Sequence, residues 1–535
     1  MKNYKKVYAA FILAGGLILH GCNGIFDDLA INPNQPSMGA YFTSPSAVND
    51  AVMTMYGYMS TQRCLGASGS KTTIIRSDEA SSNSDYGKPG MFGADLNASY
   101  YTIEQPYTLM YTTASQASYI IETAPSVDFS GNEELRNAYM GEAYFWRAFA
   151  HYYLLINFRN ISPIRQMPRN GDDYVRPLEK PAAVWNFIQE DLAHAKELLP
   201  VKGYWDSKNA GRVTKASAAA LLGKAYLYRS GIEQYYGEDK TTFYSEAAKE
   251  FGDVIDGKYG TYDLTKNYAD NFDVAHENNE ESILEFQFLG DVDNAGFNPG
   301  LATSGLAFDS RGLMLPGAGV GYEGVVHNWL YNAFVNSVDK DGYTDIRMFS
   351  TMIFNDLDAS IHLRNDAGGN PVRLEGPGGY KWEELYPAKN GKEGFATVSN
   401  PLAHSFKAGI RKGIDCSMPT QTEADGTPKL VGVGAGVKEY VYNQPRAHGV
   451  NWRYIRYADV LMMYAESVVS GGTPASNMTP LQAVNKVRGR ANMSELPSVT
   501  MADIQNERIL EFALEGHRFY DLLRWGKLAS RFTEL

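Results

Sequence analysis

The sequence predicts a mostly α-helical protein that carries a large loop-rich insertion with short strands. Three observations lead to this fold class. Apolar residues recur at helical spacing along much of the chain as far as about residue 256. Gly, Pro, Asn and Asp then become frequent and helical periodicity is sparse up to about residue 450, after which helices return. We therefore expect two helical blocks that pack together as a scaffold beneath the insertion.

Four segments of the first block have one apolar face at helical spacing. A proline follows the second segment, and Ser230-Gly231 follows the third, which is typical of a helix C-terminus. The predicted helices cover residues 134–158, 185–199, 215–229 and 244–255.

The last two of these helices have the spacing of a repeat. Leu222, Gly223 and Tyr226 are followed by Ala247 and Phe251, in the order found in tetratricopeptide repeats. A glycine would let neighbouring helices approach closely, and the two aromatic rings would fill the space between them. The pattern predicts a tetratricopeptide-like helix-pair scaffold, although generic helix hairpins share much of it.

The insertion and the second block give fewer signals. Alternation over 283–288 predicts an isolated strand, and 325–334 is the one segment of the insertion with clear helical periodicity. The second block is predicted to contain helices at residues 457–469, 480–490 and 502–514.

Composition limits the classes of function. The chain has 535 residues, too many for one ordinary core, and 49 Lys+Arg against 61 Asp+Glu give a net charge of −12. This balance argues against nucleic-acid binding, which usually requires a basic patch. Three cysteines cannot make a disulfide framework, and Cys64 and Cys416 are as well explained by two buried thiols as by a pair.

The N-terminus resembles a bacterial lipoprotein signal. Three early lysines precede the apolar stretch 7–19, which is too short to span a bilayer, and Gly21-Cys22 follows. In such signals the cysteine is acylated and becomes the first residue. We expect Cys22 to hold the protein at the cell outer membrane by a lipid anchor alone; an ordinary secretory signal is the alternative.

The C-terminal part carries motifs of a known family. Residues 507–526 (ERILEFALEGHRFYDLLRWG) closely resemble the signature of the SusD/RagB family of outer-membrane nutrient-binding lipoproteins. Residues 456–466 (RYADVLMMYAE), 484–491 (VNKVRGRA) and 141–148 (GEAYFWRA) resemble further segments of that family. The alternating Glu and Arg side chains of 507–518 predict ion pairs that tie packed helices together, so we interpret the signature as scaffold.

The resemblance implies a SusD-like fold and function. Members capture glycans, and some capture peptides, at the cell surface and cover a TonB-dependent transporter of the SusC type. The expected organisation is a signal peptide at 1–21, a lipidated tether at 22–45, a helical region at 46–256, a ligand-binding region at 257–450 and a C-terminal helical region at 451–535. Family members usually continue beyond the RWG motif, whereas this chain ends at Leu535, which favours truncation over a genuine short form.

Motifs for catalysis or cofactor binding are weak. The glycines of 319–324 match a dinucleotide fingerprint, but a βαβ unit does not surround them. Asp339 begins a stretch like a calcium loop, but its glycine comes two positions too early, and a turn is the better interpretation. The histidines are scattered and interpreted as surface or packing residues. We expect no cofactor, no catalytic residue and no metal ligand, with a surface glycoside hydrolase as the less favoured alternative.

Glycan binding requires exposed aromatic faces and polar groups on loops above a rigid base. The first loop with such residues follows residues 76–79 and contains Asp85, Tyr86 and Phe92. The second is the 290–390 insertion, where Tyr322 and Trp382 follow glycine-rich runs and so have little local core to fill. These five residues are the predicted ligand contacts. A structural subunit that only closes the transporter remains a third possibility, and the sequence does not identify the glycan.

Overall fold

The computed structural model describes residues 42–61, 64–66, 69, 71–82, 101–167, 175–288, 324–376, 381–386, 388, 390–397, 401–412, 430–432, 438–440 and 450–534. This part of the chain is mostly helical, as predicted, with a few short antiparallel strands. The predicted signal peptide, Cys22 and Cys416 lie outside the described residues, whereas Cys64 is buried.

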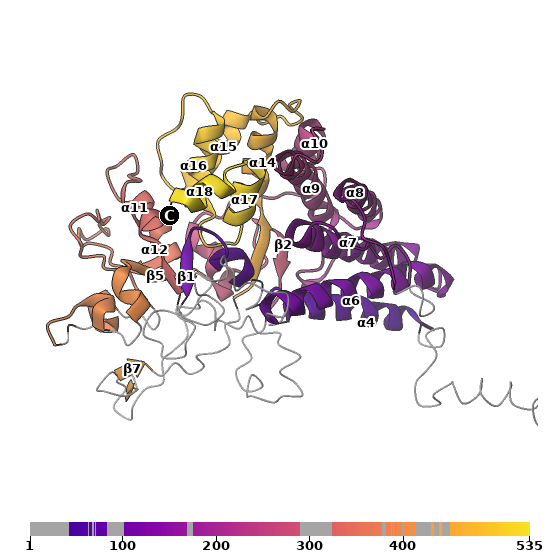
Figure 1. Cartoon of the computed structure of the whole chain (residues 1–535), viewed down its shortest axis with the longest axis horizontal. Helices are drawn as coiled ribbons and strands as arrows, with labels where there is room; N and C mark the ends of the chain where they lie inside the picture. The colour runs from indigo at the N-terminus through magenta and orange to yellow at the C-terminus, as the bar shows by residue number, and fades with distance from the viewer. Residues whose placement is uncertain are drawn as a thin grey trace, which may run out of the picture.

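The described part of the first helical block contains six α-helices, more than the four segments predicted from periodicity. In chain order, each helix from α6 to α10 packs against the next, and α4 packs against both α6 and α7 (Figure 1). The helices are α4 (Pro45–Ser60), α6 (Tyr101–Thr123), α7 (Glu133–Phe158), α8 (Pro181–Leu198), α9 (Lys215–Tyr236) and α10 (Tyr244–Ile255).

Helix α9 corrects one prediction. It continues past Ser230-Gly231 to Tyr236 and ends at Gly237, which adopts the left-handed conformation with φ of 71°. Gly231 has another purpose: a Cβ atom at this position would lie 2.3 Å from the carbonyl oxygen of Arg524. The glycine therefore allows a close helix contact and does not end the helix.

The close approach predicted around Gly223 is confirmed. A Cβ atom there would lie 2.7 Å from Cε1 of Phe251, so the ring of α10 packs directly on the backbone of α9. The tetratricopeptide-like description of these helix pairs stays a prediction.

The second block packs on the first, as expected. Helix α14 packs against α10, and α17 packs against α9. The predicted bounds of α14 and α15 are confirmed, but the predicted helix at 502–514 is too long: α16 ends at Glu511, and positive φ angles at Leu514 and Gly516 turn the chain into a new helix. The elements are α14 (Tyr457–Val469), α15 (Pro480–Arg490), α16 (Met501–Glu511), α17 (Arg518–Arg524) and α18 (Leu528–Glu534).

The described residues contain three small antiparallel sheets, and the insertion supplies strands to each of them. The predicted strand at 283–288 is β2 (Ser282–Phe286), which pairs with β8 (Trp452–Arg456), and β6 (Leu430–Gly432) pairs with β7 (Lys438–Tyr440). The predicted helix at 325–334 is wrong in its first turn, because residues 324–326 form a strand of a four-stranded sheet before α11 begins. That sheet has the order β1-β3-β5-β4 and contains β1 (Ala80–Ser82), β3 (Gly324–Val326), β5 (Ala408–Ile410) and β4 (Met352–Phe354). Short helices accompany it: α11 (Asn328–Val335), α12 (Arg347–Thr351) and α13 (Trp382–Leu385).

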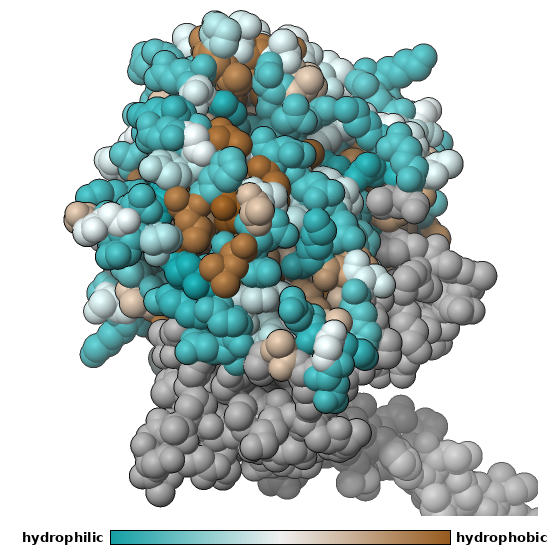
Figure 2. Space-filling view, turned by 90° about the vertical axis from the view of Figure 1, so that its left-hand side faces the viewer, coloured by the Kyte–Doolittle hydropathy of each residue, from teal (hydrophilic) through white to brown (hydrophobic). Residues whose placement is uncertain are grey.

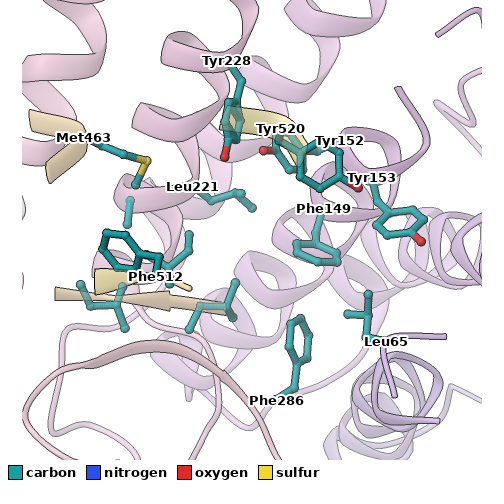
Figure 3. Close-up of a cluster of buried hydrophobic side chains, with 14 of the residues drawn as sticks. Leu65, Phe149, Tyr152, Tyr153, Leu221, Tyr228, Phe286, Met463, Phe512 and Tyr520 are labelled. Atoms are coloured by element: carbon teal, nitrogen blue, oxygen red, sulfur yellow. The ribbon is translucent and has the colours of Figure 1, made fainter. Parts of the chain in front are cut away.

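Aromatic rings fill the centre of the molecule where the two blocks meet (Figure 3). Phe149 of α7 lies 5.6 Å from Phe286 of β2, measured between ring centroids. Tyr152 of α7 stacks on Tyr228 of α9 at 6.0 Å, and Tyr228 lies 6.5 Å from Tyr520 of α17. Some of the many tyrosines therefore pack in the hydrophobic core.

The signature residues form a buried ion-pair network, which confirms their interpretation as scaffold. The Arg456 guanidinium donates two hydrogen bonds to the Glu515 carboxylate, both at 2.9 Å, and one each to Glu281 and Glu511 at 2.6 Å. Arg347 donates to Glu511 and Glu507. Burial alone would raise the pKa of Glu511, but the surrounding guanidinium groups hold it well below its ordinary value. Further members are Asp345, Lys412, Arg488 and Arg490.

None of the described helices is both long and apolar enough to cross a bilayer.

Gly231→Ala is expected to destabilise the protein by about 1–3 kcal/mol, because the added methyl group collides with the backbone of Arg524. Chemical denaturation measures the change. Gly57→Ala is the matched control: Gly57 lies inside α4 with no atom within 4 Å of the added Cβ, so this variant gains about 0.5–1 kcal/mol from helix propensity. Equal effects of the two variants would contradict the close contact.

Arg456→Met is expected to destabilise the protein by about 3–5 kcal/mol, because Glu281, Glu511 and Glu515 stay buried while losing a shared cation. The control is Arg136→Gln, since Arg136 makes a partly exposed pair with Glu133 at 3.5 Å and should contribute less than about 1 kcal/mol. Denaturant midpoints of both variants test this, and a small loss for Arg456→Met would mean that the network does not hold the blocks together.

Candidate functional site

Three long connections leave one end of the four-stranded sheet. Ser82, the last residue of β1, is the Cα partner of Gly324, the first residue of β3. Gly324 lies against Ile410, the last residue of β5, because a Cβ atom at Gly324 would be 2.6 Å from Cδ1 of Ile410. The segments 83–100, 289–323 and 413–429 therefore start or end at neighbouring positions of the sheet.

Two of these segments carry predicted ligand contacts. Asp85, Tyr86 and Phe92 follow Ser82, and Tyr322 precedes Gly324 by two positions. All four lie outside the described residues, so their contact with a ligand stays a prediction. The structure does show that the two loops, far apart in the sequence, attach to paired residues of one sheet.

Trp382, the fifth predicted contact, is described and is only 8% exposed. Its ring lies 4.7 Å from that of Tyr386 and 4.9 Å from that of Phe395, between ring centroids. The expectation that a glycine-flanked aromatic has little local core to fill is corrected here, because residues 382–397 fold back into a small aromatic core of their own. A role of Trp382 in ligand binding stays a prediction.

The strands of this sheet are attached to the signature segment. Arg347, at the start of the helix that leads into β4, binds Glu507 and Glu511. Lys412, just after β5, donates to Glu515 at 2.9 Å. The rigid base beneath the three connections is thus part of the buried ion-pair network.

Asp78 fixes the entry to β1. Its carboxylate accepts hydrogen bonds from Arg518 at 2.9 and 3.0 Å and from Arg531 at 2.7 Å. Its carbonyl oxygen accepts hydrogen bonds from Trp329 Nε1 and His327 Nδ1. Burial would raise the pKa of Asp78, but the two arginines outweigh burial and lower it. This residue therefore joins β1, β3 and the C-terminal helices.

Glu79 lies beside Asp78 and is buried. Its carboxyl group accepts a hydrogen bond from the backbone N–H of Leu514 at 2.9 Å and lies 3.1 Å from Ser77 Oγ. Burial, with the nearby Asp78 charge, raises the pKa of Glu79 from 4.5 to about 8. The group is therefore largely protonated at neutral pH and serves to attach β1 to the signature segment.

His327 lies between β3 and α11 and contacts the residues at β1. Its Nδ1 donates to the Asp78 carbonyl oxygen at 2.9 Å, so its Nε2 accepts the hydroxyl of Ser81, 2.7 Å away. Burial lowers its pKa. Both ring nitrogens therefore have structural partners, which agrees with the interpretation of the histidines as packing residues.

The described residues contain no group of three or more His, Cys, Asp or Glu side chains placed to hold a metal ion. The calcium-like stretch is a turn: Asp339 Oδ1 accepts the N–H groups of Asp341 and Tyr343, and Oδ2 pairs with Arg364.

Apolar residues gather on the face that carries α11 and α12 (Figure 2). Val338, Ile346, Leu357 and Val372 are among the exposed large hydrophobic residues of the described chain. These four side chains are aliphatic and offer no flat ring on which a sugar can stack. The predicted aromatic contacts instead belong to the connections at the loop-bearing end of the sheet, which is therefore the candidate ligand site.

Two family models match the two ends of the chain. The model described as "SusD family" matches residues 421–534, and the model described as "Starch-binding associating with outer membrane" matches residues 31–227. The chain belongs to the SusD/RagB family. The SusD family models leave residues 228–420 unmatched, and these include three of the four strands that form the base of the candidate site.

Individual relatives agree with this assignment. A SusD-like protein of Bacteroides ovatus is 25% identical over 98% of this chain and 83% of its own length. A SusD superfamily protein from Bacteroides vulgatus has a similar fold, with a TM-score of 0.65 and 22% identity over 92% of this chain and 91% of that chain. A laminarin-binding SusD-like protein superposes with a TM-score of 0.63 and 22% identity over 92% of this chain and 94% of its own.

The third connection, 413–429, was not among the predicted binding loops. Each strand of the sheet that it leaves is only three residues long, so periodicity in the sequence is too short to reveal the sheet. Sequence reasoning therefore missed the geometric relation between the loops, although it singled out two of the three.

Glu79→Gln is expected to change the pH dependence of stability. Because the folded-state pKa is raised to about 8, the contribution of the neutral carboxyl is complete below about pH 4.5 and is lost as the pH rises through 8. The glutamine side chain keeps an oxygen that can accept from the Leu514 N–H and an N–H that can donate to Ser77 Oγ, but it carries no charge. The variant should exceed wild type in stability by on the order of 4 kcal/mol near pH 8 and by little near pH 4.5.

Thermal melts across this pH range measure the difference. Glu495→Gln, at an exposed position, is the control and should give a difference from wild type that is nearly independent of pH. A flat difference for Glu79→Gln as well would contradict the raised pKa.

Proposed function

We propose that this chain is a cell-surface glycan-binding protein that delivers oligo- or polysaccharide to a TonB-dependent transporter of the SusC type, without catalysis. The observation that carries the proposal is the attachment of two predicted binding loops to paired residues of one sheet. Aromatic rings on converging loops can stack on the apolar faces of sugar rings while amide and carboxylate groups bind the hydroxyls.

Relatives support the class of ligand. One structural neighbour is described as laminarin-binding, and one family model is described as starch-binding and associating with the outer membrane. An open aromatic site of this kind binds weakly, with Kd on the order of 1 mM to 1 μM. Weak binding suits a protein that must release its ligand to a transporter.

The proposal includes a location. Acylation at Cys22 would hold the mature protein at the outer membrane with its loops facing the cell exterior. The transporter would be its protein partner, with no role for nucleic acid.

Peptide binding in the same role is the principal alternative, because loops that bind amides and aromatic groups also suit peptides. A glycoside hydrolase is less favoured: near the sheet, the buried carboxylates of Asp78, Glu507 and Glu511 are occupied by arginines, and that of Glu79 is hydrogen-bonded to the Leu514 N–H and Ser77.

Affinity electrophoresis against a panel of polysaccharides, followed by calorimetry, tests the proposal with protein that lacks Cys22. Retardation by one glycan without release of reducing sugars is the expected result. Retardation by peptides alone would support the alternative, and sugar release would contradict a binding role without catalysis.

Alanine at Tyr86, Phe92 or Tyr322 is expected to raise Kd for the bound glycan about three- to tenfold each, because each substitution removes one stacking face. Calorimetry measures the change. Tyr236→Ala is the matched control: this tyrosine is 47% exposed at the end of α9, away from the sheet, and its loss should leave Kd unchanged. Unchanged affinity in all three loop variants would move the site elsewhere.

A further inference from the structure

A small cavity lies in the core where the two helical blocks meet. It has a volume of about 10 Å³, and its lining includes Tyr152, Lys224, Tyr228 and His517. Tyr152 and Tyr228 belong to α7 and α9 of the first block, whereas His517 directly precedes α17 of the second. Figure 3 shows Tyr152 and Tyr228 beside Tyr520 at this junction.

Three polar atoms of the lining residues have no hydrogen-bond partner among the described residues: Tyr152 Oη, Tyr228 Oη and His517 Nε2. All three are buried. Leaving a buried polar group without a partner costs on the order of 1–3 kcal/mol, so three such groups around one cavity require an explanation.

The hydrogen-bonding role of His517 follows from its other neighbour. Lys224 Nζ, an ammonium donor, lies 3.4 Å from His517 Nδ1. Burial, with the Lys224 charge, lowers the pKa of His517 to about 4, so the ring is neutral near pH 7. Nδ1 is then the acceptor, and Nε2 carries the ring hydrogen as a donor.

We propose that this cavity holds one ordered water molecule, which accepts a hydrogen bond from His517 Nε2–H and exchanges hydrogen bonds with the hydroxyls of Tyr152 and Tyr228. A buried water needs a space of at least about 10–15 Å³ and two to four polar partners. The cavity reaches the lower end of this volume, and its lining residues carry three unpartnered polar atoms. The water joins α7, α9 and the turn before α17, and so connects the two blocks.

A bound anion fits less well. The carboxylate of Asp459 binds Lys224 at 3.2 Å and neutralises its charge, and Glu515 also lines the cavity. A halide is larger than water and would lie near these carboxylates, so water is the ligand that both space and charge favour.

A crystal structure that resolves ordered waters tests the proposal directly. The expected result is one density peak within hydrogen-bond distance of His517 Nε2 and of at least one of the two tyrosine hydroxyls. Absence of a peak, or an anomalous signal there after a bromide soak, overturns the proposal.

Two phenylalanine variants add an energetic test. Tyr464 is the matched control, because it is also fully buried with an unpartnered hydroxyl but does not line the cavity. Tyr228→Phe should lower Tm by about 1–2 °C, since it removes a hydrogen bond to the water, while Tyr464→Phe should leave Tm unchanged or raise it. An equal shift in both variants contradicts the proposed hydrogen bond, and if Tyr228→Phe does not fold, the wild-type density decides.

Discussion

The buried contact between Arg456 and its three carboxylates is the constraint on which the rest of the fold depends. An ion removed from water must be matched by partners in good geometry, so every element that supplies a partner is fixed in position. Arg456 is the last residue of β8, and its partners come from the segment before β2, from the last residue of α16 and from the turn after α16. Five cations match five carboxylates in this network: Arg347, Lys412, Arg456, Arg488 and Arg490 with Glu281, Asp345, Glu507, Glu511 and Glu515.

The same network extends to the candidate site. Lys412 and Arg347 attach β5 and β4 to the signature segment, and the Leu514 N–H attaches β1 through Glu79. The sheet is small and its strands are short, so its own backbone hydrogen bonds would hold it weakly. Its rigidity therefore comes from side chains that reach into the helical scaffold. The ends of loops that start from such a base are fixed, while the amino-acid sequence between these ends can vary.

Local signals explain which parts of this structure were predictable. The bounds of α14 and α15 follow from periodicity and caps within the helices themselves. The predicted ends of α9 and α16 were wrong because the actual ends depend on distant partners. Gly231 allows a close contact with Arg524 inside α9. Glu515 lies beyond the end of α16 and still binds Arg456. The four-stranded sheet was missed because its strands lie far apart in the chain. Of the predicted ligand contacts, Trp382 was judged from its glycine neighbours, whereas its burial depends on Phe395.

Because the signature residues serve the scaffold, they identify a family without identifying a ligand. The charged groups of the signature pair with one another and with neighbouring charges inside the protein, so little of their hydrogen-bonding capacity is left for a ligand. Specificity must then arise where side chains are not needed for the scaffold. We propose that the connections that leave the sheet at Ser82 and Gly324 meet this condition, since they carry aromatic and acidic residues suited to sugars. The residues that hold the ends of these connections lie outside them, so a substitution at a proposed ligand contact would not remove a member of the buried ion-pair network.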